Sequence, residues 1–122
     1  GIVHSMAHTL GGIFHVSHGL ADAVLLPYVI RYNEADPRAK KVYDDFAQKV
    51  GAQHLYTAVE ELNKTLNIPS CLKEIIPEEA QFVAKLDEMA KLAKEDGCTK
   101  TNPVIPDEEE FKQLFMKAYK GE

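Results

Sequence analysis

The spacing of apolar residues is the feature of this sequence that most constrains its fold. Apolar residues recur at intervals of three and four along the chain, and nowhere do Val, Ile, Thr and aromatic residues form a clear alternating run. Intervals of three and four place side chains on one face of a helix, whereas a half-buried strand needs an interval of two. The pattern therefore predicts an all-α protein. A length of 122 residues suits one multi-helix domain that spans 1–122.

Two helices are predicted in the middle of the chain. Asp36-Pro37 is typical of a helix start, and the helix that follows is expected to stop at Gly51. The next helix should end at Ile68-Pro69, because a residue before proline disfavours helical angles. Their apolar stripes, which we expect to contribute to a common interior, are Ala39, Val42, Phe46 and Val50 in the first and Leu55, Ala58, Val59, Leu62 and Leu66 in the second.

Two further helices are predicted in the last third of the chain. Glu78 and Glu79 follow Pro77 and suit the positive end of a helix dipole, and Gly97 ends this helix. Pro106 and the acidic run 107–110 indicate the start of the last helix. The predicted buried faces are Phe82, Val83, Leu86, Met89, Ala90 and Ala93 in the third helix and Phe111, Leu114, Phe115 and Ala118 in the fourth.

Histidines are concentrated at the beginning of the chain, where four of the five lie in the first 18 residues. On a helix, the imidazoles of His4 and His8 project from one face about one turn apart. Gly11-Gly12 then permits either a close approach or a break. Ser17 is expected to cap a second helix whose first turn carries His18. That helix is expected to bend at its internal proline, residue 27.

The residue types in this cluster do not by themselves decide its chemistry. Neutral imidazole is a good ligand for Fe(II) or Zn(II), yet a stable site normally needs three or four ligands, often with a carboxylate. The cluster therefore fits a metal site or a set of buried and surface histidines without a ligand. His54 lies apart from the others and is expected at the surface. No serine or cysteine has the spacing of a hydrolase nucleophile.

Charge and composition exclude several classes of protein. The net charge of −5 and the absence of a Lys/Arg-rich run make nucleic acid an unexpected partner. The longest apolar stretch, residues 23–30, is much shorter than the roughly 20 residues of a membrane-spanning helix. The two cysteines are far apart in a chain without a signal segment at its start, which favours reduced thiols in a soluble, cytoplasmic protein.

Two segments closely resemble signatures of one enzyme family. The first is Gly1-Ile-Val-His-Ser-Met-Ala-His-Thr-Leu-Gly-Gly-Ile-Phe-His-Val-Ser-His-Gly-Leu-Ala21 with the following Ala23-Val-Leu-Leu-Pro27, which resembles the long second signature of iron-containing (group III) alcohol dehydrogenases. The second is Cys98-Thr-Lys-Thr-Asn102-Pro103, which resembles the family's C-T-x-x-N-P element. Leu66-Asn-Ile-Pro69 also has the place and look of a family segment. The resemblance covers essentially the whole chain.

This resemblance implies the fold and the partners of the chain. The chain would be the C-terminal, helical, metal-binding half of a dehydroquinate synthase-like fold, cut from a longer enzyme. A Gly-rich α/β domain, absent from this chain, would precede it and would bind most of the NAD or NADP. The full-length enzyme would interconvert alcohols and aldehydes or ketones, would use Fe(II) with Zn(II) as the alternative metal, and is compatible with a homo-oligomer.

The resemblance also implies roles for individual residues. His4 and His18 match the two histidines that coordinate the catalytic metal, and an aspartate and a histidine from an earlier helix would complete the shell. His8 matches a histidine beside the metal that relays a proton or orients the substrate. Cys98 falls in a segment expected to approach the substrate pocket, although a small buried apolar residue is an equally good interpretation.

Three positions depart from the family pattern. Ser17 replaces a proline that often precedes the second ligand, and Val104 replaces an arginine, which puts any phosphate or partner-domain contact of that arginine in doubt. Asp22 replaces an asparagine four residues after His18. It either adjusts the charge of the site or is a solvated aspartate on a helix face, and the second is our expectation.

Two alternatives to the enzyme are kept open. One is a small helical interaction module whose histidines bind nothing, and the other is a self-contained metal carrier without catalysis. If the enzyme interpretation holds, the isolated chain should fold as a helical domain. It should nevertheless lack dehydrogenase activity and bind metal weakly, because it lacks the nucleotide site and half of the ligands.

Overall fold

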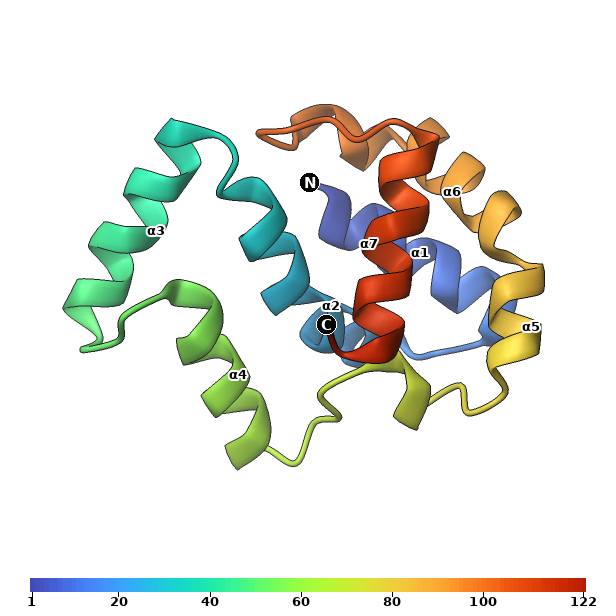
Figure 1. Cartoon of the computed structure of the whole chain (residues 1–122), viewed down its shortest axis with the longest axis horizontal. Coiled ribbons are helices and arrows are strands. Elements are labelled where there is room, and N and C mark those ends of the chain that lie inside the picture. Colours follow the sequence, from blue (N-terminus) through green and yellow to red (C-terminus); the bar gives the residue numbers. More distant parts are fainter.

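A computed structural model describes residues 1–122 and contains helices and no strand, which confirms the all-α prediction (Figure 1). Two short 3-10 helices, η1 and η2, lie between the α-helices. In chain order the elements are α1 (Ile2–Phe14), α2 (His18–Asn33), α3 (Pro37–Lys49), α4 (Leu55–Thr65), η1 (Leu72–Glu74), α5 (Glu79–Ala84), α6 (Leu86–Glu95), η2 (Gly97–Thr101) and α7 (Glu108–Lys120).

The hydrophobic core lies among α1, α2, α6 and α7, with further side chains from α5 and η1. Phe111, Phe115 and Tyr119 of α7 are fully buried, as the sequence predicts for the two phenylalanines. The rings of Tyr119 and Phe82 stack with centroids 4.3 Å apart. Burial of large aromatic side chains dominates the energetics of a core of this size. The core thus holds α1 and α2 in a fixed relation to each other.

Helix starts predicted from capping residues are confirmed. The Asp36 carboxylate accepts a hydrogen bond from the backbone N–H of Ala39 at 3.0 Å, and Pro37 occupies the first helical position. Asp107 accepts from the N–H of Glu110 at 2.8 Å, and the Glu110 carboxylate accepts from the N–H of Asp107 at 3.2 Å. Such reciprocal bonds satisfy N–H groups that a helix leaves without partners in its first turn.

The prediction of one long helix after Pro77 is wrong. Two helices, α5 and α6, occupy this region, and Lys85 separates them. Val83, predicted to be buried, is 49% exposed, whereas Phe82 and Met89 are fully buried. The helical repeat is interrupted at this break. Residues predicted to share one buried face therefore do not share a face across α5 and α6.

The expected burial of the α3 and α4 stripes is also wrong. The exposed members of these stripes are Val42 (65%), Phe46 (54%), Val50 (54%), Leu62 (56%) and Leu66 (59%). Figure 1 shows the reason, because α3 and α4 form a hairpin that extends to one side of the other helices. No residue of α3 or α4 belongs to the core cluster. An apolar stripe becomes buried only where another element packs against it.

The first segment folds as one continuous helix. Gly11 and Gly12 do not break α1, which continues to Phe14, and the chain turns at His15 with a φ of 58°. A Cβ atom at Gly11 would lie 3.3 Å from the carbonyl oxygen of Val16. The glycine therefore allows the close approach that the sequence suggested as one alternative. His18 begins α2, as predicted, with Ser17 at the N-cap position but without a side-chain hydrogen bond.

Two expectations about the chain as a whole can be compared with the structure. Cys71 and Cys98 do not form a disulfide and are both partly buried. No helix has both the length and the apolar character that crossing a membrane would require.

Candidate metal centre

Side chains from the N-terminal parts of α1 and α2 converge at one point. His4 Nδ1 lies 3.3 Å from His18 Nε2, and the two rings are stacked with an angle of 1° between their planes. The Asp22 carboxylate lies 3.0 Å from His18 Nε2 and 3.5 Å from His4 Nδ1. Two imidazoles predicted as metal ligands are thus brought together, and a carboxylate joins them.

The spacing of these three atoms fits a metal ion. Ligands about 2.0–2.1 Å from a tetrahedral ion lie roughly 3.4 Å from one another. The three separations among His4, His18 and Asp22 are 3.0, 3.3 and 3.5 Å. Imidazole nitrogen and carboxylate oxygen are suitable ligands for Fe(II) and Zn(II). The residues present therefore fit a divalent transition-metal ion.

The position of Asp22 differs from our expectation of a solvated helix-face aspartate. Its side chain is only 25% exposed, and its Oδ1 atom is enclosed and accepts no hydrogen bond. Spacing of four residues brings Asp22 next to His18. The packing of α1 on α2 places His4 beside the same carboxylate and helps to enclose it. Sequence reasoning identified the correct neighbour and judged the exposure wrongly.

His8 lies beside this cluster with a separate partner. Its Nδ1 atom lies 2.9 Å from the Asp96 carboxylate, and its ring stacks on His18 with centroids 5.1 Å apart. An ionised carboxylate only accepts hydrogen bonds, so His8 donates through Nδ1–H and its Nε2 atom is left to accept or release a proton. His8 is about half exposed, at 49%.

Asp96 was not identified from the sequence. The backbone N–H of Cys98 and the His8 side chain both donate to its carboxylate, and they lower its pKa below the ordinary value of 3.8. Asp96 and His8 are separated by 88 positions in the sequence, so no local pattern connects them. The only signal was the position of Asp96 just before the Cys98 motif.

The Cys98 motif is held against α1 by two buried polar side chains. The Thr99 hydroxyl donates to the Ala93 carbonyl at 2.6 Å and shares a hydrogen bond with the Ser5 hydroxyl at 2.7 Å. Asn102 accepts from the backbone N–H of Ile2 at 3.1 Å through its Oδ1. Buried polar groups that are satisfied in this way fix the position of η2.

Cys98 therefore lies next to His8, which is where a residue of the substrate pocket would be expected. Its thiol is partly buried, and its Sγ lies within 4.8 Å of the ligand atoms of His8 and Asp96. The alternative of a fully buried apolar cysteine does not describe this position. A role in substrate contact remains a prediction.

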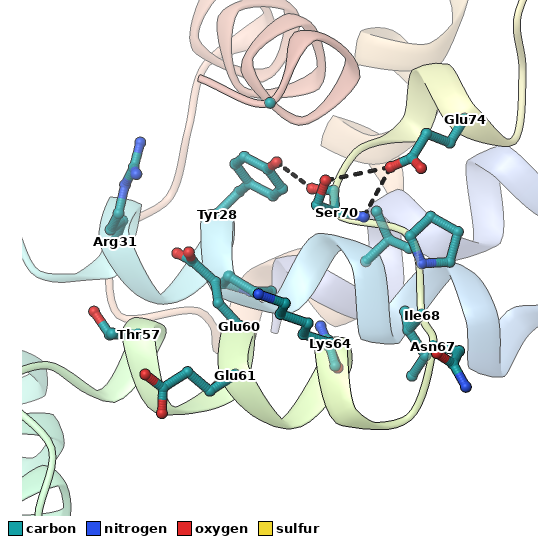
Figure 2. Close-up of a pocket in the computed structure, with 15 residues that line it drawn as sticks. Tyr28, Arg31, Thr57, Glu60, Glu61, Lys64, Asn67, Ile68, Ser70 and Glu74 are labelled. Carbon is teal, nitrogen blue, oxygen red and sulfur yellow. Dashed lines mark hydrogen bonds between the residues drawn. The ribbon is translucent and has the colours of Figure 1, made fainter.

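A cavity of about 770 Å³ lies away from the histidines. It is bounded by α2, α4 and the segment 67–74 (Figure 2). Figure 2 shows the Tyr28 hydroxyl donating to the Ser70 carbonyl, at 2.5 Å, and Glu74 accepting from Ser70. Burial raises the pKa of Tyr28 to about 12, so this phenol remains a donor at neutral pH. The candidate metal centre is by contrast an open surface whose histidines are half exposed.

A helical domain that presents two imidazoles and a carboxylate at one point offers side chains of the kinds that bind transition-metal ions. Residues 1–119 match the model of the C-terminal domain of the Fe-containing alcohol dehydrogenase family. The chain belongs to this family. The prediction made from the two signature segments is thereby confirmed.

Individual relatives agree with this assignment. The chain is 37% identical, over 99% of its length, to an NADPH-dependent butanol dehydrogenase of Clostridium saccharobutylicum, and 38% identical, over 98%, to an alcohol dehydrogenase of Thermococcus barophilus. An iron-containing alcohol dehydrogenase structure from Thermococcus thioreducens matches all of the chain with a TM-score of 0.90 and 40% identity. The chain spans about a third of each of these proteins, 33%, 31% and 32% respectively.

The lowered pKa of Asp96 predicts a pH-dependent effect of Asp96→Asn on stability. A carboxylate whose pKa is lowered by folding stabilises the fold at pH values above its ordinary pKa. This contribution is lost as the pH falls through the lower pKa of the folded protein. We expect Asp96→Asn to lower the free energy of unfolding by up to about 1 kcal/mol at pH 7, because Asn keeps the cap but loses the charge. Denaturant unfolding at pH 7 and pH 3 should show the difference shrinking in acid. A difference that stays constant would contradict the prediction.

Proposed function

We propose that this chain forms the metal-binding wall of the active site in an NAD(P)-dependent, iron-containing alcohol dehydrogenase that interconverts alcohols with aldehydes or ketones. The observation that carries the proposal is the convergence of His4, His18 and Asp22 beside the His8–Asp96 pair. A metal carrier needs ligands but no His–Asp pair beside them. An interaction module needs neither the ligands nor the pair. A separate imidazole held by a carboxylate next to the ligands therefore favours the enzyme.

In this proposal His4 and His18 hold the metal, Fe(II) with Zn(II) as the alternative. Asp22 contacts both imidazoles and offsets positive charge at the centre. When bound, the metal supplies Lewis acidity that polarises the substrate oxygen. Further ligands are expected from an earlier part of the polypeptide, because two imidazoles alone do not complete a stable site.

His8 is the proposed catalytic residue. Asp96 fixes its ring by accepting from Nδ1–H, which leaves Nε2 free to exchange a proton with the substrate hydroxyl or to orient it. Cys98 lies beside this pair and is proposed to form part of the substrate pocket. The small alcohol or aldehyde would thus lie between the metal ligands and a histidine that is not itself a ligand.

The nucleotide is proposed to bind elsewhere in the polypeptide. The relatives are about three times as long as this chain, which leaves ample length for a domain that binds NAD or NADP. Hydride transfer needs a nicotinamide positioned against the substrate, so the N-terminal domain is the essential partner of this chain. The inactivity of the chain in isolation is part of the same proposal.

His8→Ala in the complete enzyme tests the proposal. We expect the variant to keep its metal and to lose turnover by about 100-fold to 10,000-fold, the range for removal of a general acid or base. Metal content by elemental analysis and nicotinamide absorbance with short alcohols would measure the two effects. His15→Asn is the matched control, because His15 belongs to the same segment and contacts none of these ligands. Loss of metal in His8→Ala, or unchanged turnover, would contradict the assignment.

A further inference from the structure

The α3–α4 hairpin is attached to the rest of the molecule through few buried residues. Only Ala39 and Ala47 of α3 and Asn63 of α4 are buried, and none belongs to the core cluster. A polar contact also holds the hairpin, because the Asn63 side-chain amide donates to the Ala23 carbonyl at 2.8 Å. A segment that buries so little apolar area needs another source of stability.

Three potential metal ligands from α2, α3 and α4 lie close to one another. Glu34 caps the C-terminus of α2, Asp44 belongs to α3, and His54 is the N-cap of α4. One ligand atom of each lies within 4.8 Å of the other two. All three residues are partly buried, although the sequence suggested a surface position for His54. The tertiary fold alone brings them together.

The carboxylate of Glu34 has one oxygen atom that is shielded from solvent. Its Oε2 atom is enclosed and accepts no hydrogen bond from any residue. An enclosed carboxylate oxygen without a partner is unfavourable, because it loses its hydration and gains nothing in return. A cation bound at this point would satisfy it.

One member of the cluster, Asp44, is paired with an exposed lysine. Lys40 Nζ lies 2.7 Å from the Asp44 carboxylate, and the side chains of the two residues are 49% and 40% exposed. An ion pair this exposed is worth roughly 0–1 kcal/mol. Two carboxylates therefore face one exposed ammonium group, and Asp44 can exchange Lys40 for a more strongly bound cation.

We propose that Glu34, Asp44 and His54 form a second, structural metal site that binds a divalent transition-metal ion such as Zn²⁺ and ties α2, α3 and α4 together. An imidazole nitrogen with two carboxylate oxygens suits Zn²⁺ better than Mg²⁺ or Ca²⁺, which prefer all-oxygen sites. Tetrahedral ligands lie roughly 3.4 Å apart, so side-chain movements that shorten the separations by up to about 1.4 Å close the site, with water as the fourth ligand. None of its residues belongs to the proposed catalytic centre, and the site does not depend on the catalytic proposal.

Zinc titration of a His4→Ala/His8→Ala/His18→Ala variant of the chain tests this site. The three replaced side chains are 48–50% exposed, so the core is left intact, and both other clusters of potential ligands are dismantled. We expect calorimetry to show one Zn²⁺ per chain. His15 and His54 are then the remaining histidines, and in NMR spectra we expect Zn²⁺ to shift the His54 imidazole signals but not those of His15.

Two neighbouring aspartates on α3 provide a matched pair of variants. Asp44→Asn should abolish zinc binding in this background, whereas Asp45→Asn, which removes an equal charge from a residue outside the cluster, should leave it unchanged. At free zinc about 100 times the Kd, hydrogen exchange in α3 and α4 should slow by up to about 100-fold. Absence of zinc binding, equal effects of the two aspartate variants, or a shift of His15 alone would overturn the proposal.

Discussion

Replacing His18 by alanine in the complete enzyme is expected to remove the metal and the activity together. His18 is one of the two imidazoles of the proposed centre, and its Nε2 lies 3.3 Å from His4 Nδ1 and 3.0 Å from the Asp22 carboxylate. Without it His4 is the one proposed ligand left on this side of the site, too few to hold the ion. We expect more than about 100-fold loss of metal affinity and a loss of turnover of at least that size, since even residues behind the ligands have effects of 10-fold to 100-fold.

Metal content and turnover measured on the same preparations would test this result. His4→Ala should behave like His18→Ala, whereas His15→Asn should keep both properties, because asparagine tolerates the left-handed conformation found at His15. Circular dichroism would verify that the half-exposed substitutions preserve the helices. A His18→Ala enzyme with its full metal content would refute the ligand assignment.

Phe115→Ala is expected to destabilise the isolated chain by about 3–5 kcal/mol. The Phe115 side chain is fully buried in α7, and its truncation loses the transfer free energy of the ring and leaves a cavity. The expected loss is a large share of the roughly 5–15 kcal/mol that stabilises a domain, and it should lower the Tm by roughly 10–20 °C. Denaturant and thermal unfolding followed by circular dichroism would measure the change.

Phe46→Ala is the matched control for this prediction. Both residues are phenylalanines in helices, but Phe46 of α3 is 54% exposed, so its replacement should change the free energy of unfolding by about 0.5 kcal/mol or less. If Phe115→Ala prevents folding altogether, Phe115→Leu should retain the fold with a smaller loss that can be measured. Equal destabilisation at the two positions would show that the α3 stripe is buried after all.

The helices themselves could be predicted because their signals are local. The Asp36 cap and the Asp107–Glu110 capping box act within three residues, and the buried face of α7 follows from one helical period. The break at Lys85 was missed because it carries no glycine or proline, the residues that usually interrupt a helical pattern. At Gly11 the sequence did not decide between a helix that continues and one that breaks, because glycine allows a break without requiring one.

The candidate site could be predicted in part. His4 and His8 share a helix face, and His18 follows one short turn later, so the concentration of imidazoles at one point is visible in 18 residues. Asp96 and the exposure of Asp22 were not predictable in this way. Asp96 reaches His8 from 88 positions away, and Asp22 is enclosed only because α1 packs on α2.

Caps, prolines and helical spacing act over a few residues, so the all-α class, most helix ends and the group of histidines at the start could be predicted from the sequence. Which apolar stripes are covered and which carboxylates meet the imidazoles depends instead on the packing of helices against one another. The stripes of α3 and α7 look alike in the sequence, yet Phe46 is exposed and Phe115 is buried. Burial depends on whether a second element packs against the face, and no helix carries that information in its own residues.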